Sequence, residues 1–358
     1  MQTLKKPRNT NVEVLRILAI FLIILNHYSL LGGFKYYDPL SFNAILIQFL
    51  HSGGKFGVNL FIFLSGYYSY TAEKVNVRHI AKFLLEVTFY SVLFAVFGIC
   101  FHTLSLKGIV KMLIPIPFVE WPFITYYFLL MCLTFWFNKM MHALNEKQHR
   151  ALVIGLGAIW CVIPTFFKAD FGMSVFGWYV YVFLLAGYVR RIIDDIHVPS
   201  KTLFAVSGVF YGLILLSELV IDWFGVHYKW SLLKYAEHFR NMTSLLVMVS
   251  MVALVIGVLK LAPKHNRFIQ TVASTTLAVF VIHDNKAMIP FLWVKWFRTN
   301  KFTHSPFLIL HAIGTCLLIL GICVIIDLIR QKTVGKLEDR FLGKPIDALD
   351  AKVNAFLR

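Results

Sequence analysis

The sequence is poor in charged residues, and this scarcity excludes most soluble folds. Only 15% of its 358 residues are Asp, Glu, Lys or Arg, whereas 58% are hydrophobic. Soluble domains usually carry about 25% charged residues, so the composition predicts an integral membrane protein. Acidic residues are the scarcer kind, with 18 against 35 Lys and Arg. Because basic residues collect in the cytoplasmic loops of membrane proteins, the net charge of +17 does not indicate binding to nucleic acid.

Motifs for metal binding and nucleophilic catalysis are also missing. The sequence contains no Gly-x-Ser-x-Gly, no phosphate-binding loop and no His-Glu-x-x-His. The five cysteines lie within apolar runs and lack the spacing of a zinc site or a disulfide framework: Cys100, Cys132, Cys161, Cys316 and Cys323. We therefore expect no metal and no disulfide framework.

Long apolar runs are abundant. Since about 20 apolar residues cross a bilayer, these runs predict an all-α, polytopic membrane protein with about ten transmembrane helices. The predicted helices lie near residues 12–31, 43–70, 80–102, 121–138, 151–167, 174–190, 202–221, 241–260, 269–292 and 306–329. The connections that this order places inside are basic, beginning with Lys5, Lys6 and Arg8, although the outer segment 295–301 is also basic. The positive-inside rule therefore predicts that both termini are cytoplasmic.

The first apolar run, residues 11–31, carries polar residues that a lipid-facing helix would avoid. Arg16 and His27 lie eleven residues apart, which on a helix places them within about 20° on one face and about 16 Å apart. Polar groups in a membrane cost a few kcal/mol each, so this face is a candidate functional site. An imidazole can accept a proton near neutral pH, and a guanidinium suits a phosphorylated ligand. The alternatives are a packing role for His27 and a simple helix-surface ion pair between Glu13 and Arg16.

A second polar constellation interrupts the predicted helix 269–292. His283, Asp284 and Asn285 follow one another about 14 residues, or about 21 Å, from its inner end, a depth comparable to that of His27. Two histidines and a carboxylate at one level could act as a base and its orienting partners. A proton relay in a transporter and a structural role are the alternatives.

The second predicted helix and the C-terminal tail are both irregular in sequence. Residues 51–67 contain Lys55 and several glycines, which predicts a kink or an unwound turn buried in protein. Beyond a membrane domain at 1–330, residues 331–358 form a basic, amphipathic cytoplasmic tail interrupted at Gly343–Pro345. This tail is either an interfacial segment or a solvated regulatory one.

Several motifs in order resemble the acyltransferase-3 family of bacterial membrane acyltransferases, and the resemblance covers nearly the whole chain. The opening Glu13-x-x-Arg16-x-x-Ala19 and the Arg16-x10-His27 spacing are similar to the signature of that family. Further similar segments are GVNLFIFLSGY (57–67), 121–141, 178–191, 274–285 and 325–330.

The resemblance implies an acyl-CoA donor, usually acetyl-CoA, bound from the cytoplasmic side, and an acceptor hydroxyl on a glycan. It implies that His27 is the catalytic base and that Arg16 helps to hold the donor. From the residue patterns and the resemblance together, we predict His27, His283 and Asp284 as catalytic residues, and Arg16 with Glu13 as donor-binding residues. We expect the protein to lie in the cell membrane. Its expected partners are the lipid bilayer, a cell-envelope or exported polysaccharide, and a separate extracytoplasmic transferase or polysaccharide assembly protein.

Two other functions remain open at this point. In a polysaccharide-lipid or proton-coupled transporter, Arg16, His27 and His283 would line a polar path without any acyl transfer. In a non-catalytic scaffold of an assembly complex, Arg16 and His27 would tolerate replacement.

Overall fold

The computed structural model describes residues 9–36, 38–167, 169 and 171–357, and these contain helices but no β-strand. Seven of the helical segments are long and apolar enough to cross a membrane: Thr10–Leu31, Val77–Cys100, Glu146–Phe166, Val175–Asp195, Ser200–His227, Trp230–Leu259 and Leu308–Lys332. The predicted all-helical, multi-pass fold is thus confirmed. The count of ten membrane helices and the cytoplasmic termini stay predictions, and Lys5, Lys6 and Arg8 lie outside the described residues.

The chain forms two compact units whose segments alternate along the sequence. Unit 1 consists of the described residues up to Phe61, together with Asp195–Leu277 and Arg298–Leu320. Unit 2 consists of Ile62–Asp194, Ala278–Phe297 and the described residues from Gly321 onward. Helices α2 (Phe42–Ser69) and α13 (Leu308–Lys332) each contribute residues to both units.

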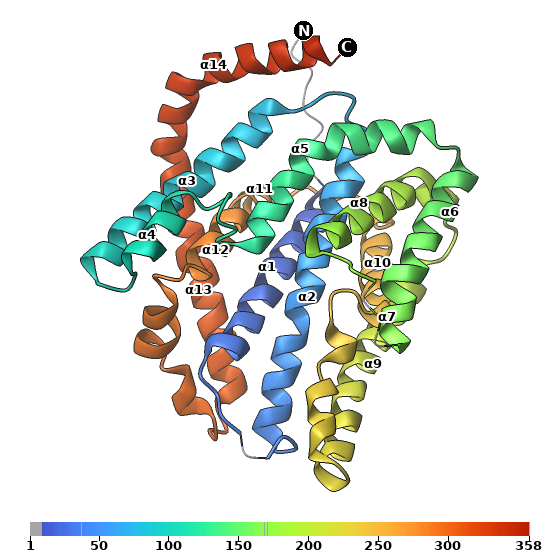
Figure 1. Cartoon of the computed structure of the whole chain (residues 1–358), viewed down its shortest axis with the longest axis vertical. Coiled ribbons are helices and arrows are strands. Elements are labelled where there is room, and N and C mark those ends of the chain that lie inside the picture. Colours follow the sequence, from blue (N-terminus) through green and yellow to red (C-terminus); the bar gives the residue numbers. More distant parts are fainter. Residues whose placement is uncertain (1–8, 37, 168, 170, 358) are drawn as a thin grey trace. The chain divides into compact units, whose positions relative to one another are not determined.

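Unit 1 is built around α1 (Thr10–Leu31) and the first part of α2, which lie side by side (Figure 1). Its other elements are α9 (Ser200–His227), η3 (Trp230–Tyr235), η4 (His238–Arg240), α10 (Leu245–Leu259), α11 (Arg267–Ala273), η6 (Thr299–Phe302) and the start of α13. The side chain of Asn9 caps α1. Thr10 then holds this end of α1 against the segment before α11, because its N–H donates to Lys264 O at 2.8 Å.

The glycines of α2 allow α1 and α2 to approach closely. A Cβ atom added at Gly57 would lie 2.6 Å from the backbone oxygen of Ala19, and one added at Gly54 would lie 2.3 Å from Cγ of Asn26. Helix α2 runs from Phe42 to Ser69 without a break. The unwound turn predicted in 51–67 as one alternative is therefore wrong, and the kink predicted as the other stays a prediction. The glycines serve close helix–helix packing, as small residues do in membrane proteins.

Replacing Gly57 by alanine is expected to destabilise the protein by about 1–3 kcal/mol, because the backbone of α1 cannot yield as a flexible side chain would. Gly212 of α9 is the matched control, since a Cβ atom added there meets nothing within 4 Å. Gly212→Ala should be neutral or stabilising by up to about 1 kcal/mol. Thermal unfolding of both variants in detergent measures the difference. Equal behaviour of the two variants would contradict tight α1–α2 packing.

Unit 2 holds most of the remaining helices. They are α3 (Val77–Cys100), α4 (Leu106–Leu113), α5 (Pro122–Ala143), α6 (Glu146–Gly157), the π-helix η1 (Ala158–Val162), α7 (Ile163–Phe166), α8 (Val175–Ile192), α12 (Thr276–His283), the π-helix η5 (Pro290–Trp296) and α14 (Val334–Phe356), with the 3-10 turn η2 (Ile193–Asp195) after α8. The first two residues of α12 and the last residue of η2 belong to unit 1. Arg191 of α8 joins the ends of two helices, since it donates to Tyr70 Oη at 3.0 Å and to Met141 O at 2.8 Å.

A buried charge cluster connects α13 to α3 within unit 2. The guanidinium of Arg330 lies 2.7 Å from Asp327 and 3.1 Å from Glu86, and it is also 3.9 Å from Glu338. Tyr90 of α3 donates to the same Asp327 carboxylate at 2.9 Å. These side chains hold the end of α13, just before α14 begins, against the middle of α3.

Helix α14 continues through the point at which the sequence predicts an interruption. The helix runs from Val334 to Phe356 with Pro345 inside it, so the predicted interruption at Gly343–Pro345 is wrong. A proline within a helix removes one hydrogen bond and crowds the preceding turn, which bends a helix more readily than it ends one. The red helix in Figure 1 changes direction along its course.

Candidate functional site

Helix α1 carries the first predicted site. It is continuous over 22 residues, so Arg16 and His27 share one face at an axial separation of about 16 Å. Both side chains are half-buried. The helical premise of the prediction is thus confirmed, while the roles of the two residues stay predictions.

Glu13 and Arg16 form the predicted ion pair. Nη1 of Arg16 donates to both carboxylate oxygens of Glu13, at 3.0 and 3.1 Å. Glu13 is only 3% exposed, whereas the Arg16 side chain is 28% exposed, so the carboxylate is buried and holds a partly exposed guanidinium in one direction. Because this ion pair involves Nη1, it does not itself use the donors on Nε and Nη2, and those suit the oxygens of a phosphate.

The neighbours of His27 determine the direction in which it points. On one side, Asn26 Nδ2 donates to His51 O of α2 at 2.8 Å. On the other side, Tyr28 Oη lies 2.9 Å from Nδ1 of His311 on α13. Since successive helical residues turn by about 100°, His27 projects into the sector between these two contacts. The contacts on both sides of the imidazole therefore fix the rotation of α1 about its axis.

His283 lies in unit 2, at the last position of α12. It is fully buried, and Nδ1 is 2.5 Å from Val279 O, one turn earlier. Because a carbonyl can only accept, Nδ1 carries the proton in this hydrogen bond. The bond therefore orients the ring and selects the tautomer in which Nε2 is the basic nitrogen.

The turn after His283 is fastened to the start of α5. Trp121 Nε1 donates to Asp284 O at 3.1 Å, and Lys286 forms an ion pair with the buried Glu120 at 2.9 Å. Within the turn, Asn285 Oδ1 accepts the N–H of Ala287 at 2.9 Å. The predicted irregularity of this segment is confirmed, since α12 ends at His283 and a π-helix follows from Pro290.

The predicted site residues are thus distributed over both units. Glu13, Arg16 and His27 belong to unit 1, and the structure brings the first two into contact. His283 and Asp284 belong to unit 2. Their cooperation with His27 stays a prediction.

The sequence interpretation missed a polar face of α2 in unit 1, which contacts α9 and the segment before α10. Gln48 Nε2 donates to Asp222 at 2.6 Å, Ser52 Oγ lies 2.8 Å from Tyr211 Oη, and Asn59 Nδ2 donates to Met242 O at 2.8 Å. Asp222, Ser52 and Asn59 are all buried. Their side chains repeat at helical spacing within apolar runs, and that pattern is visible in the sequence.

Arg240 of η4 completes this polar face. It is buried beside Glu218 of α9, with Nη1 at 3.5 Å from the carboxylate, and it also forms an ion pair with Glu237. Glu218 and Asp222 stand one turn apart on α9, and both are 2% exposed. A buried guanidinium between carboxylates fixes the packing of α9 against the segment before α10.

Comparison with known protein families gives one match. The family model described as an acyltransferase domain, Acyl_transf_3, matches residues 9–328. The matched region begins one residue before α1 and includes both polar constellations. Neither the curated proteins nor the solved structures yield a match.

Proposed function

Since the chain belongs to the Acyl_transf_3 family of membrane acyltransferases, we propose that it moves an acetyl group from acetyl-CoA to a hydroxyl of a cell-envelope or exported polysaccharide. The observation that carries this proposal is the placement of Arg16 and His27 on one face of α1, inside the region that the family model matches. We further propose that it works in the cell membrane, alone or with a separate extracytoplasmic transferase or polysaccharide assembly protein.

Arg16 is proposed to bind the donor. Coenzyme A carries phosphates, and a guanidinium binds phosphate oxygens through parallel N–H donors. Glu13 contributes by holding Nη1 of Arg16 at 3.0 Å, which lowers the entropy lost when the donor binds. The thioester would then extend along α1 towards His27, over the axial distance of about 16 Å.

His27 is proposed to act as the general base. It takes the proton of the acceptor hydroxyl while that oxygen attacks the thioester carbonyl carbon. The new C–O bond forms, the C–S bond of the thioester breaks, and the coenzyme A thiolate leaves and takes up the proton. No residue of the chain needs to become acylated in this step. For His283 and Asp284 we propose catalytic roles in handling the proton, supported by the buried, hydrogen-bonded imidazole of His283.

The function is tested with the full-length protein in membranes, supplied with labelled acetyl-CoA and the host polysaccharide. We expect release of free coenzyme A that depends on the polysaccharide, with an equal amount of ester-linked label on the glycan by mass spectrometry. Butyryl-CoA in place of acetyl-CoA tests the acetyl preference. Glycan-lipid translocation without coenzyme A release would instead favour a transporter. If the protein shows neither activity, the non-catalytic scaffold is the function that remains.

A further inference from the structure

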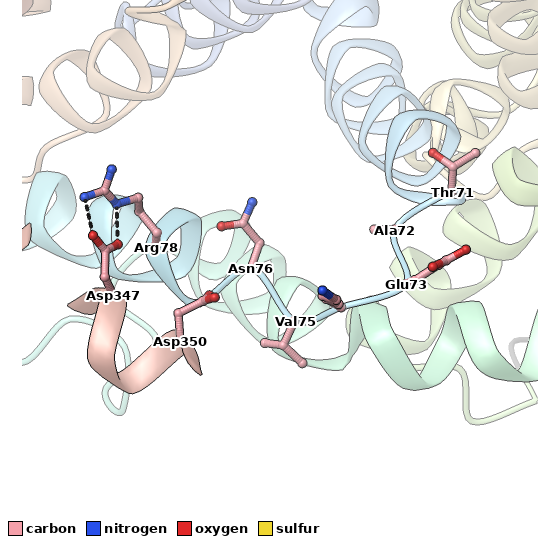
Figure 2. A pocket seen from close by; sticks show the side chains of 9 residues that line it. Thr71, Ala72, Glu73, Val75, Asn76, Arg78, Asp347 and Asp350 are labelled. Atoms are coloured by element: carbon pink, nitrogen blue, oxygen red, sulfur yellow. Dashed lines mark hydrogen bonds and ion pairs between the residues drawn. The ribbon is translucent and has the colours of Figure 1, made fainter. Parts of the chain in front are cut away.

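The last helix, α14, has one face that is fixed to α3 and its preceding loop by polar contacts within unit 2. Asp347 pairs with Arg78 at 3.0 Å and Asp339 with Lys82 at 2.9 Å. Asp350 accepts the N–H of Val77, the first residue of α3, at 2.9 Å, a favourable place for a carboxylate because the N–H groups of a first helical turn lack partners. Figure 2 shows the Arg78–Asp347 pair and Asp350 beside this loop.

Two further contacts extend the same face of α14. Asn354 exchanges two hydrogen bonds with the backbone of Val75, at 3.0 and 2.9 Å. Gly343 lies on the same side, since an added Cβ atom would make an ordinary van der Waals contact with Nη2 of Arg78 at 3.4 Å. The contacting positions are spaced by three or four residues, which is the repeat of one helical face: 339, 343, 347, 350 and 354. The rotation of α14 about its axis is therefore fixed.

The opposite face of α14 is apolar and exposed. Leu337 is 52% exposed, Phe341 67%, Leu349 51% and Phe356 89%. Each of these residues lies two positions from a residue that contacts α3, and two positions on a helix correspond to about 200°. The contacts on the polar face thus turn these four side chains away from α3.

The acidic and basic side chains of α14 differ in their surroundings. Its four acidic side chains all contact protein groups, since Glu338 lies near Arg330 and the three aspartates bind α3 and its start. The four basic side chains of α14 are exposed instead: Lys336, Arg340, Lys344 and Lys352. An apolar row with exposed basic residues is the pattern of a helix that lies in the headgroup region of an anionic bilayer.

The position of α14 in the chain places it at a membrane boundary. It begins two residues after α13, which ends at Lys332 and is one of the helices long and apolar enough to cross a membrane. We propose that the apolar face of α14 lies in the interfacial region of an anionic bilayer, while its polar face holds the loop before α3. The helix would then bind the lipid surface through one face and hold the loop before α3 in place through the other.

The proposal is tested with the full-length protein in nanodiscs of phosphatidylcholine and phosphatidylglycerol at 3:1. On a Cys100→Ser, Cys132→Ser background, nitroxide labels are placed through Phe341→Cys, Leu349→Cys and, as a solvent control, Glu73→Cys. The labels at 341 and 349 should be several-fold more accessible to oxygen than to a water-soluble nickel chelate. The label at 73, in the loop before α3, should show the reverse preference.

Two results would overturn the proposal. If the labels at 341 and 349 react with the chelate as the label at 73 does, the apolar face is in water. If they are shielded from both reagents, another protein or a second copy of this chain covers the face. Nanodiscs of phosphatidylcholine alone test the charge requirement, because loss of the anionic lipid should weaken the oxygen preference. An unchanged preference would remove the anionic lipid from the proposal.

Discussion

Replacing His27 by alanine should lower acyl transfer by about 10²–10⁴-fold, the contribution that a positioned general base usually makes. The acceptor hydroxyl would then have to lose its proton to water while it attacks the thioester. His27→Gln should be about as inactive, since an amide keeps a polar side chain but cannot accept the proton. The measurement is the initial rate of polysaccharide-dependent coenzyme A release in membranes that contain equal amounts of each protein.

His197→Ala is the matched control, because His197 is exposed in the segment between α8 and α9. It should retain the full rate. Binding of acetyl-CoA, measured by protection against thermal unfolding, should be unchanged in His27→Ala, because the donor is assigned to Arg16. If His27→Ala transfers acetyl groups at the normal rate, His27 is not the base, although the chain could still be an acyltransferase.

Much of the helical architecture was predictable from hydropathy. The apolar runs predicted at 12–31, 80–102 and 306–329 correspond to α1, α3 and α13 within three residues at each end. This agreement follows from the bilayer, which requires a helix wherever about 20 apolar residues cross it. The spacing of Arg16 and His27 was reliable for the same reason, since α1 is unbroken between them.

Contacts between helices were less predictable, because one residue pattern can serve two structures. Glycines in a membrane helix either unwind it or let a neighbouring helix approach. The position of Ala19 beside Gly57, which only the structure shows, indicates that the glycines of α2 serve packing. The sequence left the tail either interfacial or solvated, and it did not predict that Asp339 and Asp347 pair with α3. Their partners, Arg78 and Lys82, lie more than 250 residues earlier in the chain.

Arg330→Met should destabilise unit 2 by about 3–5 kcal/mol, the usual cost of removing one partner from a buried ion pair. The guanidinium is 7% exposed, and its loss leaves the carboxylates of Asp327 and Glu86 without their cation. Arg78→Met is the matched control, because Arg78 and Asp347 are 47% and 59% exposed at their side chains. Such an exposed pair contributes about 1 kcal/mol or less.

Thermal unfolding in detergent, followed by circular dichroism, should therefore rank wild type and Arg78→Met well above Arg330→Met. The cause is tested by adding Glu86→Gln to Arg330→Met, since removing one buried charge should recover part of the loss. If Arg330→Met and Arg78→Met lose the same stability, the cluster around Arg330 is solvated and does not hold α13 against α3. If the second substitution lowers stability further, the loss comes from packing of the arginine side chain against Tyr90, which the guanidinium overlies at 5.7 Å, and not from unpaired carboxylates.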